Sequence, residues 1–120
     1  MSTFILKDNE AGAYFCLTDN GETRGISSVF ATPEERDAAL ADLRIADDCR
    51  IDNQTGQSAN GIACPKFEVI ADKVGQFRYR FRNEEGTIVF TSVVFDSVDG
   101  CIEAVKDLRA NAALIESVEE

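Results

Sequence analysis

The chain repeats itself once along its 120 residues, and this internal repeat constrains the fold more than any other feature. The offset between matching residues of the two copies is constant through the first two strands, and it increases by two residues at the turn that follows. The matching pairs are Phe4 and Phe67, Gly12 and Gly75, Tyr14 and Phe77, Gly21 and Gly86, Ser27 and Ser92, Val29 and Val94, Phe30 and Phe95, and Leu43 and Leu108. A single two-residue difference in a hairpin loop reconciles these matches, so the sequence predicts two copies of one structural unit.

Each copy has the pattern of three strands, one helix and a short fourth strand. Glycine-containing turns separate the first three strands, and Asn20-Gly21 is a strong hairpin signal because both residues tolerate positive φ. The strands expected in the first copy are 4–7, 13–19, 22–30 and 49–53, and those expected in the second copy are 67–71, 76–82, 87–95 and 114–118.

A change from alternating to helical periodicity follows the third strand of each copy. Thr32-Pro33-Glu34-Glu35 predicts a helix start, because Thr can cap the first turn, Pro suits the first helical position and Glu35 can close a capping box. Ser97 is the expected cap in the second copy. The apolar residues at helical spacing are Ala39, Leu40, Leu43 and Ala46 in the first helix, and Ile102, Val105 and Leu108 in the second.

The length of the chain indicates how the two copies are combined. A chain of 120 residues can bury one modest core but not two independent ones. We therefore expect a single compact α+β domain, in which repeat one (3–53) and repeat two (65–120) share one core, joined by a polar linker over 54–64.

The order of these features resembles the YegP-like family, also called UPF0339 or DUF1508. The second copy carries the resemblance best, in Phe67-Glu68-Val69, in Gly75 to Phe81, and in Gly86, Ser92 and Phe95-Asp96-Ser97. The resemblance implies tandem β-β-β-α-β repeats that share one mainly antiparallel sheet with exchanged last strands and carry two helices on one face. It implies no activity and no cofactor.

Composition and charge set several function classes aside. The net charge of −10 disfavours binding to nucleic acid and to anionic membranes. The chain has no histidine, which excludes a Ser-His-Asp triad, and its four cysteines lack the close spacing of a zinc site. We therefore expect no enzymatic activity, no metal and no cofactor. Without a secretory signal or a membrane-length apolar run in the sequence, the cytoplasm is the expected location.

Three arginines alternate with three aromatic residues in Phe77-Arg78-Tyr79-Arg80-Phe81-Arg82. Because side chains alternate between the faces of a strand, the aromatic residues should face the helices and the arginines should face outward. Arg78, Arg80 and Arg82 are therefore candidates for binding a small anion, a metabolite or an acidic partner. The competing interpretation is charge pairing with acidic residues on neighbouring strands.

An apolar patch is expected on the same outward face in the first copy. If Tyr14 and Cys16 point inward, Phe15 and Leu17 point outward, and Ile5 joins them. Exposed apolar patches of this kind usually mark an interface. The sequence thus favours a protein-interaction domain, with a homodimer or a protein partner bound at Ile5, Phe15 and Leu17. Cover by the linker or by a terminal segment is the alternative.

Overall fold

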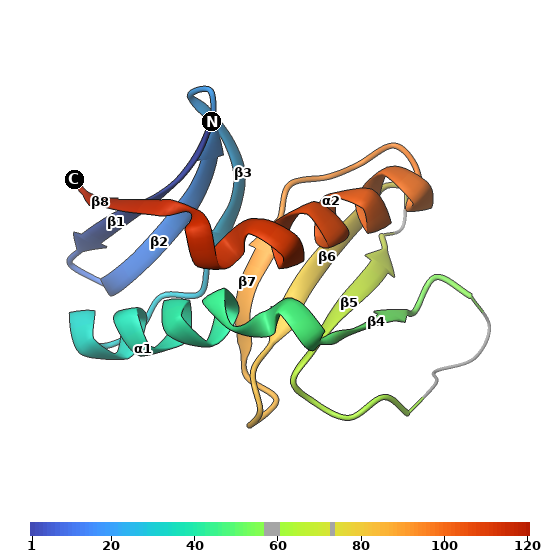
Figure 1. Ribbon diagram of the computed structural model, residues 1–120, viewed down its shortest axis with the longest axis horizontal. Coiled ribbons are helices and arrows are strands. Elements are labelled where there is room, and N and C mark those ends of the chain that lie inside the picture. The colour runs from blue at the N-terminus through green and yellow to red at the C-terminus, as the bar shows by residue number, and fades with distance from the viewer. Residues whose placement is uncertain (57–60, 73) are drawn as a thin grey trace.

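The computed structural model describes residues 1–56, 61–72 and 74–120, which form one eight-stranded mixed sheet with two helices (Figure 1). Part of the expected linker, residues 57–60, therefore lies outside the described residues. The elements are β1 (Ser2–Asn9), β2 (Gly12–Asp19), β3 (Glu22–Ser27), α1 (Pro33–Arg44), β4 (Arg50–Asn53), β5 (Lys66–Ala71), β6 (Phe77–Arg82), β7 (Ile88–Ser92), α2 (Val98–Asn111) and β8 (Glu116–Glu119), with short 3-10 turns at Ala46–Asp48 and Ala112–Leu114.

The two copies exchange their last strands, as the family resemblance implied. The strand order is β4-β5-β6-β7-β3-β2-β1-β8. β4 of the first copy pairs in parallel with β5 of the second, and β8 of the second copy pairs in parallel with β1 of the first. The other pairings are antiparallel, and β3 joins β7 at the centre. The predicted α+β fold class is therefore confirmed, and neither copy has a complete set of strand partners without the other.

Two arginines at equivalent positions of the helices hold these exchanged segments. Arg44 in α1 donates from Nη1 to the carbonyls of Ala112 (2.8 Å) and Ile115 (2.6 Å) before β8. Arg109 in α2 donates to the carbonyl of Cys49 (2.8 Å) before β4. Each helix therefore satisfies backbone acceptors of the other copy, which adds to the coupling between the copies.

Both helices lie on the same face of the sheet (Figure 1). The expected caps are present, because the Thr32 side chain accepts from the Glu35 amide and the Ser97 side chain accepts from the Gly100 amide. The Glu35 carboxylate also accepts from the Ala31 amide (3.0 Å). Within the part of the chain that the structure describes, neither helix combines the length and apolar character of a membrane span.

The core lies between the helices and the sheet and is rich in stacked aromatic rings. The rings of Phe15 and Phe90 stack at 5.9 Å, and that of Phe4 meets Phe15 edge-on at 5.7 Å. Gly25 leaves room for Phe90, because a Cβ at this position would lie 2.2 Å from the Phe90 ring. The aromatic residues Tyr79 and Phe81 of β6 lie in this core, as their alternation predicted.

The prediction that Phe15 and Leu17 face outward is wrong. Both side chains are buried in the core, with exposed fractions of 0% and 6%. In β1 and β2 the buried Phe4 is paired with Leu17, whereas in β5 and β6 the equivalent Phe67 is paired with Phe81. In the structure, Leu17 is therefore the counterpart of Phe81. The sequence alignment of Gly12 with Gly75 had instead made Leu17 the counterpart of Arg80, which faces outward.

The length difference between the copies is thus divided between two hairpins. In the first copy Ala13 forms an isolated bridge with Phe30, and in the second copy Phe77 forms one with Phe95. Because Phe30 and Phe95 are equivalent, Ala13 is the counterpart of Phe77. The sequence alignment had assigned Tyr14 to that position, one residue away. Each of the first two turns of the second copy is one residue longer than its counterpart. A one-residue shift in a strand moves every side chain to the opposite face, which explains the incorrect outward assignment.

Candidate functional site

One row of paired residues crosses all eight strands on the sheet face that carries no helix. Neighbours in this row are direct strand partners, and successive rows on one face are two residues apart along each strand. In the order of the strands from β4 to β8 the row consists of Asp52, Glu68, Arg80, Thr91, Ile26, Cys16, Ile5 and Val118. Its β4–β5–β6 end is charged, and its β8–β1–β2–β3 end is apolar.

The charged end is organised around Glu68, which is 3% exposed. One carboxylate oxygen, Oε1, accepts from Nε of Arg80 (2.5 Å) and from Nε of Arg82 (2.7 Å). The other oxygen, Oε2, lies 3.2 Å from Nζ of Lys66 and accepts from Gln54 (2.8 Å). Glu68 therefore has three cationic neighbours on two strands.

Asp52 extends this network to the edge strand β4. It is 1% exposed, and its Oδ2 lies 2.7 Å from Nζ of Lys66 and accepts from Gln54 (3.0 Å). Its other oxygen, Oδ1, is buried without a hydrogen-bond partner among the described residues. Two carboxylates and three cations thus form one network, which we call the charged cluster (Asp52, Lys66, Glu68, Arg80 and Arg82).

The cluster favours its charged state. Burial raises the pKa of Glu68, but hydrogen bonds and charge from Arg80 and Arg82 outweigh it and lower that pKa from 4.5 to about 2. The hydrogen bond from Lys66 lowers the pKa of Asp52, and the same bond raises the pKa of Lys66. The carboxylates therefore stay ionised at neutral pH, and their two negative charges offset two of the three positive charges beside them.

The three predicted arginines do not form an open cationic ridge. Arg80 and Arg82 face outward as expected, but each is paired with Glu68, and Arg82 also donates to the Gly86 carbonyl (2.7 Å). Arg78 is exposed, and no ion pair to a described residue involves it. For Arg80 and Arg82 the structure therefore shows the charge pairing that was the competing interpretation.

The apolar end of the row consists of Val118, Ile5, Cys16 and Ile26, which we call the apolar row. Val118 is 44% exposed and Ile26 is 48% exposed, while Cys16 is buried between its neighbours. Ile5, the third predicted interface residue, lies on this helix-free face between Val118 and Cys16. The sequence argument missed Val118, Cys16 and Ile26, although pairing β1 with β2 so that Phe4 and Leu17 share a face would have identified Cys16.

Mostly uncharged residues flank the apolar row on β1 and β2. Thr3 pairs with Thr18 on one side of the row, and Tyr14 pairs with Lys7 on the other. The Lys7 ammonium lies 3.3 Å from a Glu120 carboxylate oxygen, so the nearest positive charge is partly neutralised. The central part of this face therefore presents mainly apolar and hydroxyl-bearing side chains.

The cysteines are all free thiols and lie within the described residues. Burial raises the pKa of Cys16, Cys49 and Cys101 above the usual value, which disfavours the reactive thiolate. No group of three or more Cys, Asp or Glu residues is placed to hold a metal ion in residues 1–56, 61–72 and 74–120.

Comparison with known proteins identifies relatives of one and of two repeats. Residues 72–119 match the family described as a domain of unknown function (DUF1508). A UPF0339 protein of Agrobacterium fabrum is 36% identical over 55 residues, which cover 46% of this chain and 89% of that protein. A UPF0339 protein of Methanosarcina acetivorans is 38% identical over 47 residues, which cover 39% of this chain and 81% of that protein.

Two solution structures share the complete fold. The protein of unknown function yegP from E. coli superposes with a TM-score of 0.76 at 16% identity, over 99% of this chain and 92% of that chain. A UPF0339 protein from Shewanella oneidensis gives a TM-score of 0.76 at 12% identity, over 98% of this chain and 90% of that chain. The family resemblance is confirmed: this chain belongs to the UPF0339 (DUF1508) family of YegP-like proteins, whose matched members carry no established function.

Proposed function

We propose that this protein is a non-enzymatic interaction domain that binds another protein chain through the apolar row. The observation that carries the proposal is that Ile26 and Val118 remain about half exposed on a sheet face without helices. Antiparallel sheets commonly leave one face in water, but such a face is then usually polar. An apolar stripe across four adjacent strands is instead typical of a contact surface.

The edges of the sheet favour association through its face rather than through strand addition. Both edge strands, β4 and β8, contain only four residues and carry charged side chains. Short charged edge strands are a common means by which proteins prevent edge-to-edge pairing. A partner would therefore contact the side chains of the apolar row, not the backbone groups of an edge.

A second copy of the chain is the simplest partner. Two identical sheet faces can pack against each other about a twofold axis, which places each apolar row against the other. The net charge of −10 repels two copies at long range, but the middle of the face carries little charge and the repulsion is screened by salt. Association should accordingly strengthen as the ionic strength rises.

The mass of the protein in solution tests this proposal. We expect light scattering after gel filtration to show a dimer that persists on dilution, and the variant Ile26→Lys to be monomeric with an unchanged circular dichroism spectrum. Ile45→Lys is the matched control, because Ile45 is 72% exposed at the end of α1, away from the apolar row. A dimer that survives Ile26→Lys would contradict this surface assignment.

A monomer at all concentrations would exclude self-association and leave a different protein as the partner. The same pair of variants then serves in affinity capture: Ile26→Lys should lose a partner that both the wild type and Ile45→Lys retain. Equal capture by all three proteins would contradict the proposed surface.

The other features support an interaction role more than catalysis. The chain has no histidine to act as a general base. Its four free thiols fit the reducing cytoplasm, which is where we place its action. Anion binding by the arginines has weaker support, because Arg80 and Arg82 are already paired with the Glu68 carboxylate, which leaves Arg78 as the remaining candidate of the three.

A further inference from the structure

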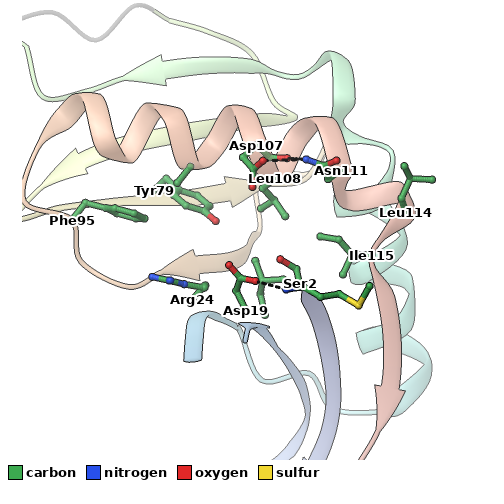
Figure 2. A pocket seen from close by; sticks show the side chains of 13 residues that line it. Ser2, Asp19, Arg24, Tyr79, Phe95, Asp107, Leu108, Asn111, Leu114 and Ile115 are labelled. Atoms are coloured by element: carbon green, nitrogen blue, oxygen red, sulfur yellow. Dashed lines mark hydrogen bonds and ion pairs between the residues drawn. The ribbon is translucent and has the colours of Figure 1, made fainter. Parts of the chain in front are cut away.

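A cavity of about 460 Å³ lies on the helix side of the sheet, on the opposite face from the apolar row. It is bounded by the C-terminal half of α2, by the start of β1 and the end of β2, and by Arg24 of β3 and Tyr79 of β6 (Figure 2). Its volume is in the range of small-molecule sites in proteins. Among the lining residues are Leu17, Arg24, Tyr79, Phe95, Asp107 and Leu108.

The fold does not require this cavity, because the equivalent region of the other half is filled. Leu17 corresponds to Phe81, as their pairings with Phe4 and Phe67 show. Phe81 is 1% exposed and packs in the core against Phe67, with 5.0 Å between the ring centroids. A smaller side chain therefore lies where the second copy has a large one.

Arg24 marks the strongest difference between the two regions. Arg24 is the unpaired residue of a β-bulge in β3, where β3 pairs with β2. Val89 is the unpaired residue of the matching β-bulge in β7, where β7 pairs with β6. Val89 is fully buried in the core, whereas Arg24 brings a guanidinium group to the cavity. The partner of Arg24 is Glu22 at 3.4 Å, and their side chains are 47% and 73% exposed, so this solvent-exposed contact is weak.

Tyr79 adds a second donor at a position where the first copy has an apolar residue. Its counterpart is Phe15, because the Ser27 and Ser92 hydroxyls accept from the Phe15 and Tyr79 amides in the same way. Within the described part of the chain no hydrogen bond to the Tyr79 hydroxyl is found, and Figure 2 shows it directed into the cavity. Burial raises the pKa of Tyr79, so the hydroxyl stays protonated and can donate.

The acidic residues of the cavity already have donors. The Asp19 carboxylate lies 3.1 Å from the N-terminal ammonium of Met1. The Asp107 carboxylate accepts from Nδ2 of Asn111 (3.2 Å). The groups left to recognise a ligand are therefore mainly donors, which suit a carboxylate.

We propose that this cavity binds a small monocarboxylic acid with an apolar body. The carboxylate pairs with the Arg24 guanidinium, and the apolar body lies among Tyr79, Phe95 and Leu108. The Tyr79 hydroxyl supplies a further donor inside the cavity. This site is independent of the proposed interaction surface, because it lies on the opposite face of the sheet.

Titration of the full-length ¹⁵N-labelled chain with three probes that share one body tests the proposal. The probes are phenylacetate, the neutral phenylacetamide and the cationic phenethylamine. We expect phenylacetate to shift the backbone amide signals of Leu17, Asp19 and Leu108, and to bind about tenfold or more tightly than the other two.

Three variants identify the site. Arg24→Gln should weaken phenylacetate binding about tenfold or more, whereas Arg78→Gln, which changes an exposed arginine on the other face, should leave it unchanged. Leu17→Phe introduces the residue type of Phe81 and should abolish binding by filling the cavity. If Leu17→Phe fails to fold, Arg24→Gln decides alone, because Arg24 is exposed and its loss leaves the core intact.

The proposal is overturned if phenylacetate leaves these amide signals unshifted, or if Arg24→Gln binds it as tightly as the wild type. It is also overturned if phenylacetamide binds equally well, since the carboxylate would then contribute nothing. Tighter binding of phenethylamine would likewise overturn it and would identify Asp19 or Asp107 as the recognition group.

Discussion

Glu68 of β5 occupies the position that Ile5 occupies in β1, and Arg80 of β6 occupies that of Cys16 in β2. Asp52 of β4 likewise occupies the position of Val118 in β8, whereas Lys66 and Arg82 correspond to Thr3 and Thr18, which flank the apolar row. In the β4–β5–β6 half the charged groups form ion pairs with one another, and in the β8–β1–β2–β3 half the side chains of the row make no such pairs. The backbone is the same in both halves, so it determines which positions face outward but not what they do.

The two halves also differ beneath the sheet, on the side of the helices. The second copy fills its half with Phe81 and Val89, and the first copy has Leu17 and Arg24 at the same positions. The core beneath the charged cluster is therefore filled by Phe81 and Val89, whereas a cavity lies beside Leu17 and Arg24 in the half that carries the apolar row. The first-copy half therefore carries both candidate binding surfaces, whereas the second-copy half has a filled core and paired charges at Glu68.

The largest expected effect comes from Phe15→Lys, which tests the strand register on which the comparison depends. Phe15 is fully buried, so an ammonium group at this position should destabilise the protein by more than about 4 kcal/mol and prevent folding. Tyr14→Lys changes the neighbouring residue on the helix-free face and should cost about 1 kcal/mol or less. Circular dichroism and urea unfolding measure both. A folded Phe15→Lys together with an unfolded Tyr14→Lys would reverse the assignment of the two faces.

Glu68→Gln should have the next largest effect, because it removes the shared carboxylate of the charged cluster. Arg80 and Arg82 would lose their carboxylate partner, while Lys66 would keep Asp52. The expected loss is about 3 kcal/mol in the free energy of unfolding, the low end for a broken buried pair. The low end applies because Arg80 and Arg82 are each about one quarter exposed and can reach water. Glu116→Gln on β8 is the control and should change stability by less than about 0.5 kcal/mol. Equal effects would show that the two halves do not differ energetically.

The pH dependence of stability gives a smaller and more specific effect. The pKa of Glu68 is lowered from 4.5 to about 2 in the folded state, so its contribution is complete above pH 4.5 and is lost as the pH falls toward 2. Asp52 changes in the same direction. Urea unfolding at several pH values should therefore show a smaller difference between wild type and Glu68→Gln at low pH. A difference that stays constant from neutral pH to about pH 2 would contradict the ionised cluster.

The smallest expected change in stability comes from Ile26→Thr, which introduces the residue type of its strand partner Thr91. Ile26 is about half exposed, so stability should change by less than about 0.5 kcal/mol. The association tested with Ile26→Lys should nevertheless weaken, since an apolar contact is lost. A loss of stability above about 2 kcal/mol, which is the size expected for a core substitution, without any change in association would indicate that Ile26 is covered within the monomer.

The sequence alone determined the repeat, the caps of both helices at Thr32 and Ser97, and the opposite orientation of aromatic residues and arginines on β6. These features depend on residues close together in the chain: a side chain that caps the next turn, or neighbours that alternate along a strand. The exchange of the last strands followed from the family resemblance, and the structure confirms it.

Only the tertiary structure decided the register of β2. Aligning Gly12 with Gly75 suggested equivalent turns, but the two glycines have different roles. Gly12 begins β2, where a Cβ would lie 2.1 Å from the Phe30 carbonyl oxygen, whereas a Cβ at Gly75 would have no atom within 4 Å. Gly12 is required by the close approach of the segment around Phe30, which follows β3, and local sequence contains no sign of that contact.

The chemistry of the two faces was likewise decided by contacts between distant residues. Glu68 forms ion pairs with Arg80 and Arg82 across a strand pair, and Asp52 reaches the same cluster from the other copy through Lys66. The cavity depends on Leu17 and Arg24 meeting α2, which belongs to the other copy and lies near the opposite end of the chain. Composition and periodicity specify which side chains are available, but strand order and register determine which of them meet, because pairing energies depend on contacts that form only when the chain folds.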